Sequence, residues 1–395
     1  MENGLKILLC HNFYQNIGGE DQAFWRQKEL LESHGHQVIC FTRDNQEIGK
    51  YHFFQKAGLA FSAFFSFDTY FKIKKIIRDE KPDIIHTHNI FPLISPSIYY
   101  AARYSRVPVI QTLHNYRLMC VNGLFLRNDG SICERCAKGN FFHAVIGQCY
   151  RQSYIQSLVM AAVLFIHRLL GTFRKIDFFI SPSEFLKSKM NEHGADFKVV
   201  CIPNFVGDNA GPLSDASCEN TICYFGRLSR EKGLATLLKA VKGTAARLRI
   251  VGEGPLRQEL EKIIAAEGLD NVVLTGFKSD RDLKKEIGKA LAVVVPSEWY
   301  ENNPLSVIEA FSSGRPVIGS AIGGIPELIQ KGETGLTFEP GNAGDLREKI
   351  KSLLNNPALA ARMGKTAREY ARTHFSPARH YEELMRVYQK AAIKK

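Results

Sequence analysis

The chain has 395 residues, of which 45% are hydrophobic and 23% are charged. This length suits two domains, and the hydrophobic content excludes an intrinsically disordered chain. A formal net charge of +12 favours anionic partners, namely nucleic acid, anionic membrane or phosphorylated small molecules. Because no long block of Lys and Arg marks a nucleic-acid tail, we expect no nucleic acid among the partners.

The cysteine count and the hydropathy pattern bear on the cellular compartment. Nine cysteines, an odd number scattered over a long chain, do not resemble a secreted disulfide scaffold. The run at 5–10 reads as a strand and not as a signal peptide. No segment reaches about 18 uninterrupted apolar residues, since the richest one, 158–166, stops at His167. We therefore expect a cytoplasmic protein.

Short apolar runs alternate with amphipathic stretches through the first half of the chain. Six of these runs read as strands: 5–10, 37–42, 83–88, 107–114, 177–183 and 198–204. Helical spacing is found at 22–35 and at 73–80, where the second helix stops before Pro82. This alternation predicts a parallel sheet with helices on both faces.

The same alternation restarts in the second half. Six further runs read as strands: 221–228, 246–254, 271–277, 291–297, 316–321 and 335–340. Helical spacing between them is clearest at 256–267 and 305–313. We therefore predict an α/β chain of two Rossmann-like, doubly wound domains that face a cleft, with ligands at the carboxyl ends of the strands.

The domain boundaries follow from composition. We predict a first domain at 1–204, which includes a four-cysteine insertion at 120–149, and a second domain at 205–376. The stretch 203–220 is rich in Gly, Pro, Ser and Asp and reads as the linker. A last helix within 377–395 could pack back on the first domain or belong to the second.

Fixed cations suit the phosphates of a ligand better than a metal site here, and the alternative for the segment 226–233 taken alone is a solvated basic turn. The segment GRLSREKG, at 226–233, follows a strand, precedes a helix and includes Arg227 and Lys232. Arginine and lysine can neutralise a leaving pyrophosphate in place of a divalent metal. The Asp-x-Asp at 280–282 reads as the acidic first turn of a helix. We expect that catalysis requires no cofactor.

Two glycine-containing turns have different implications. VGEGPL, at 251–256, is followed by Arg257, where the dinucleotide fingerprint has its third glycine. This departure argues against a nicotinamide dehydrogenase. Gly18 and Gly19 lie between the first strand and its helix, where a backbone without Cβ atoms can approach a phosphate.

The most specific segment is 296–327, which reads as strand, loop, helix, strand and Gly-Gly loop. Glu301 lies in the loop and Glu309 within the helix, and two carboxylates suit the binding of sugar hydroxyls. Residues 303–305 lie at the start of that helix, where free backbone N–H groups favour phosphate.

This segment resembles the Glu-x7-Glu signature of the family 4 glycosyltransferases, retaining enzymes with the GT-B fold. Matching segments follow in order over nearly the whole chain: the Gly-Gly loop at 18–19, DIIHTHN at 83–89, TLHNYR at 112–117, GRLSREKG, VGEGP and IGGIPE at 322–327. Two departures concern Asn302-Asn303, where a Gly or Phe-Gly pair is frequent, and Glu20, where a small or apolar residue is frequent. Because of the departure at Asn302-Asn303, the identity of the donor sugar is not predicted.

The resemblance implies roles for individual residues. The residues implied in catalysis are Glu301, His114, Arg227 and Lys232. The residues implied in donor binding are Gly18, Gly19, Arg227, Lys232, Glu301, Asn303, Pro304, Leu305 and Glu309. Among them, Arg227 and Lys232 would stabilise the leaving diphosphate and Glu309 would hold the ribose hydroxyls.

The function implied is transfer of a hexose, with retention, from a nucleotide diphosphate sugar to a glycan or lipid-linked glycan acceptor in polysaccharide biosynthesis. Two alternatives stay open. One is a sugar-nucleotide epimerase of the same fold, and the other is a non-catalytic protein that binds sugar nucleotides or nucleic acid.

Four cysteines are spaced C-x12-C-x2-C-x12-C, at Cys120, Cys133, Cys136 and Cys149. This spacing suits a tetrahedral structural zinc site, while reduced thiols and disulfides are the alternatives. We expect the zinc site, which would stabilise the segment and take no part in catalysis.

The segment 53–78 is dense in phenylalanine and ends with basic residues. One interpretation is a buried helix pair that packs on the first sheet. The other is a surface that faces an anionic membrane and meets a lipid-linked acceptor, which would place the protein peripherally on the inner face of the membrane.

Overall fold

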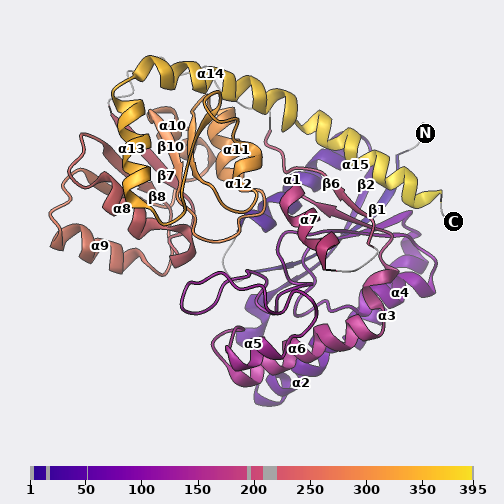
Figure 1. The fold of residues 1–395 in the computed structure, drawn as a ribbon. Helices are drawn as coiled ribbons and strands as arrows, with labels where there is room; N and C mark the ends of the chain where they lie inside the picture. The colour runs from indigo at the N-terminus through magenta and orange to yellow at the C-terminus, as the bar shows by residue number, and fades with distance from the viewer. Residues whose placement is uncertain (1–3, 15–17, 51, 194–196, 208–219, 394–395) are drawn as a thin grey trace. The chain divides into compact units, whose positions relative to one another are not determined.

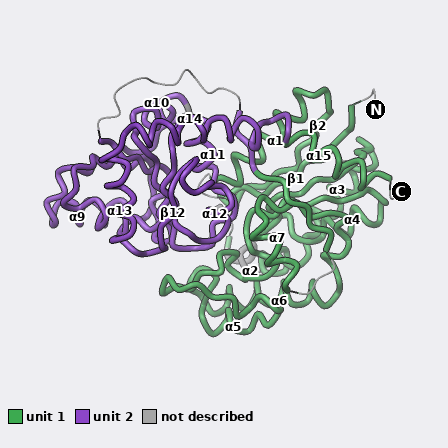
Figure 2. Tube along the Cα trace, turned by 45° about the horizontal axis from the view of Figure 1, so that its top comes forward, with its two compact units in different colours: residues 1–203, 380–395 green, residues 204–379 purple. Residues whose placement is uncertain are grey.

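The computed structural model describes residues 4–14, 18–50, 52–193, 197–207 and 220–393. The chain divides into two compact units, residues 1–203 with 380–395 (unit 1) and residues 204–379 (unit 2), as Figure 2 shows. Most of the predicted linker at 203–220 lies outside the described residues.

Unit 1 is built on a parallel sheet with strand order β2-β1-β3-β4-β5-β6, of which β1, β2 and β6 are labelled in Figure 1. Its strands are β1 (Lys6–Phe13), β2 (Gln37–Asp44), β3 (Ile84–Thr87), β4 (Val109–Thr112), β5 (Phe178–Ser181) and β6 (Val199–Cys201). All six strands predicted for the first half are confirmed. The interior strands β3, β4 and β5 are buried at every position, as expected for a parallel sheet covered on both faces.

The helices that complete unit 1 are α1 (Gly19–Ser33), α2 (Phe53–Phe64), α3 (Phe67–Glu80), α4 (Ser97–Tyr104), α5 (Phe142–Ile146), α6 (Tyr154–Leu169), α7 (Glu184–Glu192) and most of α15 (Pro377–Ala392), with short 3-10 turns η1 (Asn45–Lys50) and η2 (Thr172–Lys175). Helix α3 begins six residues before the predicted start at 73, because the Ser66 hydroxyl caps it by accepting the Thr69 N–H at 3.2 Å. None of the helices described is long and apolar enough to cross a membrane.

Helix α15 packs on the sheet of unit 1. Its buried residues Leu384, Val387, Tyr388 and Ala391 recur at helical spacing and join a core with Ile7, Ile84 and Ile110 from β1, β3 and β4. The Tyr388 hydroxyl also bonds to Nδ1 of the buried His86 at 2.7 Å. The last part of the chain is therefore an integral layer of unit 1.

Unit 2 contains a second parallel sheet, with order β12-β11-β10-β7-β8-β9. Its strands are β7 (Thr221–Phe225), β8 (Arg247–Val251), β9 (Val272–Gly276), β10 (Ala292–Val295), β11 (Val317–Ser320) and β12 (Gly335–Phe338), each within a predicted run. Its helical elements are η3 (Arg230–Lys232), α8 (Leu234–Val241), α9 (Arg257–Ala266), α10 (Asp280–Gly288), α11 (Leu305–Ser312), α12 (Ile325–Leu328), α13 (Ala343–Leu354) and α14 (Pro357–His374).

The sheet of unit 2 separates two hydrophobic cores. Ile222 and Val294 belong to one core, while their chain neighbours Cys223 and Val293 belong to the other. Successive side chains of a strand point to opposite faces, so an uninterrupted apolar run can serve both cores.

Candidate functional site

Two loops that are far apart in sequence meet at the carboxyl ends of adjacent strands in unit 2. The loop 226–233 follows β7, and the loop 296–304 follows β10, its neighbour in the sheet. Gly233 has φ +68°, and a Cβ atom on it would lie 1.8 Å from the Pro296 carbonyl oxygen. A glycine is required there because the backbones touch and because φ lies in the left-handed region.

This contact brings two predicted catalytic residues together. Nζ of Lys232 donates a hydrogen bond to Oε1 of Glu301 at 2.6 Å, and Oγ of Ser297 donates to the same oxygen at 2.7 Å. Burial acts to raise the pKa of Glu301, but the charge and hydrogen bond of Lys232, with bonds from neighbouring side chains, lower it below its usual value. Glu301 is therefore a buried carboxylate held in its ionised form by a cation.

The Gly-Gly loop after β11 holds the backbone of Glu301. The Gly324 N–H donates to the Glu301 carbonyl at 2.8 Å. Gly323 has φ +60°, and a Cβ atom there would lie 2.4 Å from the same carbonyl oxygen. The close approach expected of these glycines is thus made with the protein's own backbone at Glu301.

The start of α11 is fixed by an asparagine pair. Oδ1 of Asn303 accepts the Asn204 N–H at 3.0 Å, and the Asn204 side chain donates to the Asn303 carbonyl at 3.0 Å. Pro304 is the N-cap, and the helix begins at Leu305. The first-turn N–H groups of a helix have no partner within the helix, which makes this a suitable anion site.

The other predicted donor residues of unit 2 lie on the same elements. Glu309 is half-buried on α11. Arg227 is exposed on the loop after β7, and its carbonyl accepts a hydrogen bond from the Tyr224 hydroxyl at 2.8 Å. Asp282 lies in the first turn of α10 and pairs with Lys285 at 3.0 Å, as expected for a helix start.

In unit 1 the predicted glycines precede α1. Gly18 is the N-cap, and its N–H donates to Oδ2 of Asp21 at 2.8 Å, while Gly19 is exposed at the first helical position. Oδ1 of the buried Asp21 bonds to Nε2 of His11 at 2.7 Å. The glycine turn is thereby anchored to β1, the strand that precedes it.

His114 follows β4 and lies against a second histidine. Its Nε2 is 2.7 Å from Nδ1 of His88, which follows the neighbouring strand β3. Burial, with a contribution from His11, lowers the pKa of His114 to about 3, so the imidazole is neutral at physiological pH. Nε2 of His88 is buried without a partner, which favours the tautomer in which His88 Nδ1–H donates to His114. His114 then carries its own proton on Nδ1.

A further cluster around Glu20 was not predicted. Asn115 donates its side-chain N–H to Oε1 of Glu20 at 2.9 Å and lies 3.3 Å from the Tyr14 hydroxyl. Burial raises the pKa of Glu20, and the Asn115 hydrogen bond opposes that rise. Oε2 of Glu20 is buried without a hydrogen-bond partner. The sequence offered one sign of this cluster, namely that Glu20 departs from the family pattern.

Other residues of these sites were not predicted individually. His88 lies in the matching segment 83–89, and Ser297 and Trp299 lie in 296–327, so their segments carried the signal. His11, Asp21 and Asn204 lie outside the matching segments quoted above. The four predicted zinc ligands lie in unit 1 as free thiols. Over the described part of the chain, no three or more His, Cys, Asp or Glu side chains are arranged to hold a metal ion.

Comparison with family models and known proteins covers both units. Residues 17–209 match the model "Glycosyltransferase Family 4", and residues 213–370 match "Glycosyl transferases group 1". An uncharacterized glycosyltransferase of Methanocaldococcus jannaschii is 25% identical over 76% of this chain and 73% of its own. The alpha-D-kanosaminyltransferase of Streptomyces kanamyceticus is 30% identical to this chain over an aligned region. That region covers 44% of this chain and only 46% of that enzyme.

A solved structure supports the fold over the full length. The HepE protein of Anabaena, in complex with UDP, superposes with a TM-score of 0.69 at 19% identity, covering 98% of this chain and 100% of that one. Two parallel six-stranded sheets with flanking helices agree with that similarity. The chain therefore belongs to the family 4 glycosyltransferases and has their GT-B fold.

Proposed function

We propose that this glycosyltransferase transfers a hexose, with retention at the anomeric carbon, from a nucleoside diphosphate sugar to a glycan or lipid-linked glycan acceptor in polysaccharide biosynthesis. The HepE structures, which include complexes with UDP and with UDP-glucose, support a nucleotide sugar as the donor.

The observation that carries the proposal is the Lys232–Glu301 pair beside the start of α11. A buried carboxylate can accept hydrogen bonds from sugar hydroxyls, and a lysine bound to it offers positive charge at the same place. The first-turn N–H groups of α11 supply further positive potential. These features suit a ligand that joins a sugar to a diphosphate.

Different side chains of the site would serve different parts of the transfer reaction. The bond from the anomeric carbon to the diphosphate oxygen breaks, a bond to the acceptor hydroxyl oxygen forms, and the hydroxyl proton is released. Lys232 and Arg227 would stabilise the negative charge that develops on the leaving diphosphate. Glu301 would orient the hexose and Glu309 the ribose. Gly18, Gly19 and His114 of unit 1 remain predicted donor-side residues.

The test is incubation of the purified chain with UDP-, GDP- and ADP-sugars, with and without glycan and lipid-linked acceptors. We expect release of one nucleoside diphosphate that depends on the acceptor. NMR of the product should show the anomeric configuration of the donor. An inverted product would contradict retention, and an epimerised sugar formed without acceptor would replace transfer by the epimerase alternative.

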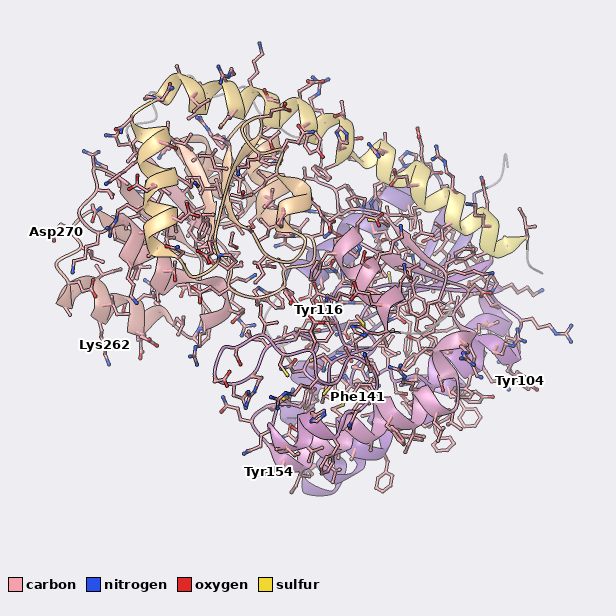
Figure 3. All side chains as sticks on the ribbon, in the orientation of Figure 1. Tyr104, Tyr116, Phe141, Tyr154, Lys262 and Asp270 are labelled. Atoms are coloured by element: carbon pink, nitrogen blue, oxygen red, sulfur yellow. The ribbon has the colours of Figure 1, made fainter. Side chains whose placement is uncertain are left out.

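The acceptor side of the proposal rests on exposed apolar residues of unit 1. They lie on α2, α3, α5 and α6 and are Phe61, Phe67, Phe71, Phe142, Ile146, Ile155, Leu158, Phe165 and Leu169. We call this set the apolar surface. Helices α2 and α6 pack together, since the Phe64 carbonyl bonds to Nε2 of His167 at 2.9 Å. Tyr104 and Tyr154, labelled in Figure 3, are exposed on α4 and α6 of the same unit.

These exposures bear on both interpretations of segment 53–78. Ile73 and Ile77 of α3 are buried, but Phe61 is 81% exposed and Phe67 68% exposed. The helix pair therefore packs on unit 1 with one side and exposes phenylalanine on another. Helix α3 also carries the exposed Lys75, which pairs with Asp79 at 2.9 Å. Exposed aromatic side chains on a helix with lysines suit the interface of an anionic membrane, where a lipid-linked acceptor is held.

Vesicle binding tests this surface. Full-length protein should sediment with phosphatidylserine vesicles and much less with phosphatidylcholine vesicles, and raising salt from about 50 to about 500 mM should release it. The double variant Phe61→Ser, Phe71→Ser should bind at least about fivefold less, because each substitution removes apolar area from the membrane contact. Phe277→Ser, an exposed phenylalanine of unit 2, is the matched control and should bind normally. Equal binding by both variants would contradict the proposed surface.

A further inference from the structure

One polar cluster of unit 1 lies beside the residues predicted to face the donor. Its members, which come from the loops after β1 and β4 and from the first turn of α1, are Tyr14, Glu20, Asn115 and Arg117. We call this set the Asn115 cluster. Each of its side chains is partly exposed, so the cluster reaches the surface of unit 1. Glu20 directly follows Gly19, and Asn115 directly follows His114.

The side chain of Asn115 connects the other members. Its N–H group donates to Oε1 of Glu20 at 2.9 Å and to the Tyr14 hydroxyl oxygen at 3.3 Å. Its Oδ1 accepts the backbone N–H of Arg117 at 3.0 Å. Tyr116, the buried residue between Asn115 and Arg117, is labelled in Figure 3. The Asn115 amide therefore fixes the Glu20 carboxyl group relative to the backbone of Arg117.

The guanidinium of Arg117 is held by two further contacts. Its Nη1 donates to the Val121 carbonyl at 2.8 Å, and its central carbon lies 5.4 Å from the centre of the Tyr150 ring. Tyr150 is itself anchored to α6, because its N–H donates to the Ser157 hydroxyl at 3.0 Å. An arginine positioned by a carbonyl and an aromatic ring loses little side-chain freedom when it binds a ligand.

Two polar atoms of the cluster still lack a hydrogen bond. Among the described residues, neither Oε2 of Glu20 nor Nε of Arg117 has a partner, although both atoms are buried. A Cβ atom on Gly123 would lie 3.5 Å from this Nε, so the glycine keeps one side of the nitrogen uncovered. A buried polar atom without a partner is unfavourable unless water or a ligand supplies the missing bond.

The two atoms define the chemistry of a ligand that would satisfy both. A carboxylate oxygen accepts a hydrogen bond and a guanidinium nitrogen donates one, so the ligand must both donate and accept. Neighbouring hydroxyl groups of a sugar do this, whereas a phosphate would be repelled by an ionised Glu20 beside Arg117. The ring of Tyr150 adds apolar area beside the guanidinium, as is usual where a few polar groups orient a small ligand.

We propose that Glu20 and Arg117 bind two neighbouring hydroxyl groups of a neutral acceptor sugar and that Asn115 positions them. This inference rests on the proposed transfer function and adds to it the part of unit 1 that selects the acceptor. One hydroxyl bonds to Oε2 of Glu20, and its neighbour accepts the Nε–H of Arg117. Because a hydroxyl both donates and accepts, the bond to Glu20 forms whether or not that carboxyl group is protonated.

Sugar binding to the full-length protein tests the subsite without requiring transfer. The probes are the methyl glycosides of glucose, galactose, mannose and N-acetylglucosamine, studied by saturation-transfer NMR in the presence of UDP. We expect a signal from at least one of them with the wild type, weakened at least about fivefold in Glu20→Ala and in Arg117→Met. Glu29→Ala and Arg103→Met, exposed positions on α1 and α4, are the matched controls and should bind normally. A wild type that binds none of the probes, or cluster variants that bind like the controls, would overturn the subsite.

Transfer kinetics distinguish a subsite from a purely structural role. In Glu20→Ala and Arg117→Met, KM for the acceptor should rise at least about tenfold, while KM for the donor and donor hydrolysis without acceptor stay within about twofold. With the wild type, which needs no substitution to be tested, one monodeoxy form of the acceptor should lose at least about tenfold in kcat/KM. The variant that lacks the partner of that hydroxyl should no longer discriminate against the deoxy form.

These measurements separate failure of the subsite from failure of the proposed function. Transfer with an unchanged acceptor KM in both variants would overturn the subsite and leave the transfer function intact. Sugar binding that depends on Glu20 and Arg117, without transfer to any acceptor, would support the subsite and contradict the transfer function. A donor KM that rises as much as the acceptor KM would assign the cluster a structural or donor-side role and overturn the inference.

Discussion

At the scale of single residues, Glu301 shows burial and charge in competition. Burial alone would favour its protonated form, and the Lys232 ammonium at 2.6 Å reverses that preference. The same lysine lies 5.3 Å from the centre of the Trp299 ring, so it is positioned by two contacts. Such a lysine is pre-organised to bind an anion.

Lys232→Met should lower kcat/KM for sugar transfer by about 10²–10³, because a fixed cation at the leaving group is lost. It should also leave a buried carboxylate without its partner and shift the pKa of Glu301 upward. Initial rates and thermal midpoints measure the two effects. Lys239→Met, an exposed lysine on α8, is the control and should behave like the wild type. Equal rates in the two variants would remove Lys232 from the catalytic set.

Glu20 predicts a pH dependence of stability. Its folded pKa is raised by burial, so the folded state binds the proton more tightly than the unfolded state. The contribution of Glu20 to stability is then fully present below the unfolded pKa, about 4.3, and is lost as pH rises through the raised folded value. Glu20→Gln keeps an acceptor for Asn115 and should therefore be more stable than the wild type at neutral pH, by a margin that vanishes at acid pH.

Urea unfolding at several pH values, with Glu29→Gln as an exposed control on α1, measures that margin. A Glu20→Gln variant that is less stable at neutral pH and equally stable in acid would instead show that the ionised carboxylate is favoured in the fold.

At the scale of elements, the two loops of the donor site depend on backbone contact. Gly233 and Gly243 have nearly the same φ, +68° and +70°, but only Gly233 faces another backbone atom within 4 Å. Both alanine variants should lose about 1–2 kcal/mol from left-handed strain. Gly233→Ala should additionally displace the 226–233 loop from Pro296 and reduce kcat/KM at least about tenfold. Activity at the Gly243→Ala level would show that the contact is dispensable.

At the same scale, the sequence patterns predicted strands more accurately than helix starts. Every predicted strand is present, because apolar runs bounded by Gly, Pro and polar residues have few alternatives in a covered parallel sheet. Helix starts were less accurate. Helix α1 begins at Gly19 and α3 at Phe67, since capping by Asp21 and Ser66 is decided by local hydrogen bonds and not by apolar spacing.

At the scale of the whole molecule, the fixed cations predict catalysis that is independent of divalent metal. Brief treatment with EDTA should leave the transfer rate within about twofold, because Lys232 and Arg227 supply the charge that a metal would supply. Loss of activity with EDTA and its recovery with Mg²⁺ or Mn²⁺ would contradict this prediction.

By itself, the sequence determined the family, the two parallel sheets and the residues of the carboxylate motif, because periodicity and motif spacing are local properties of the chain. Only the tertiary structure decided which of these residues form hydrogen bonds with one another. Lys232 and Glu301 are 69 positions apart, and Glu20 and Asn115 are 95 apart. The physical reason is that parallel strands place the loops at their carboxyl ends along one edge of the sheet. Neighbours there are set by strand order and not by distance along the chain.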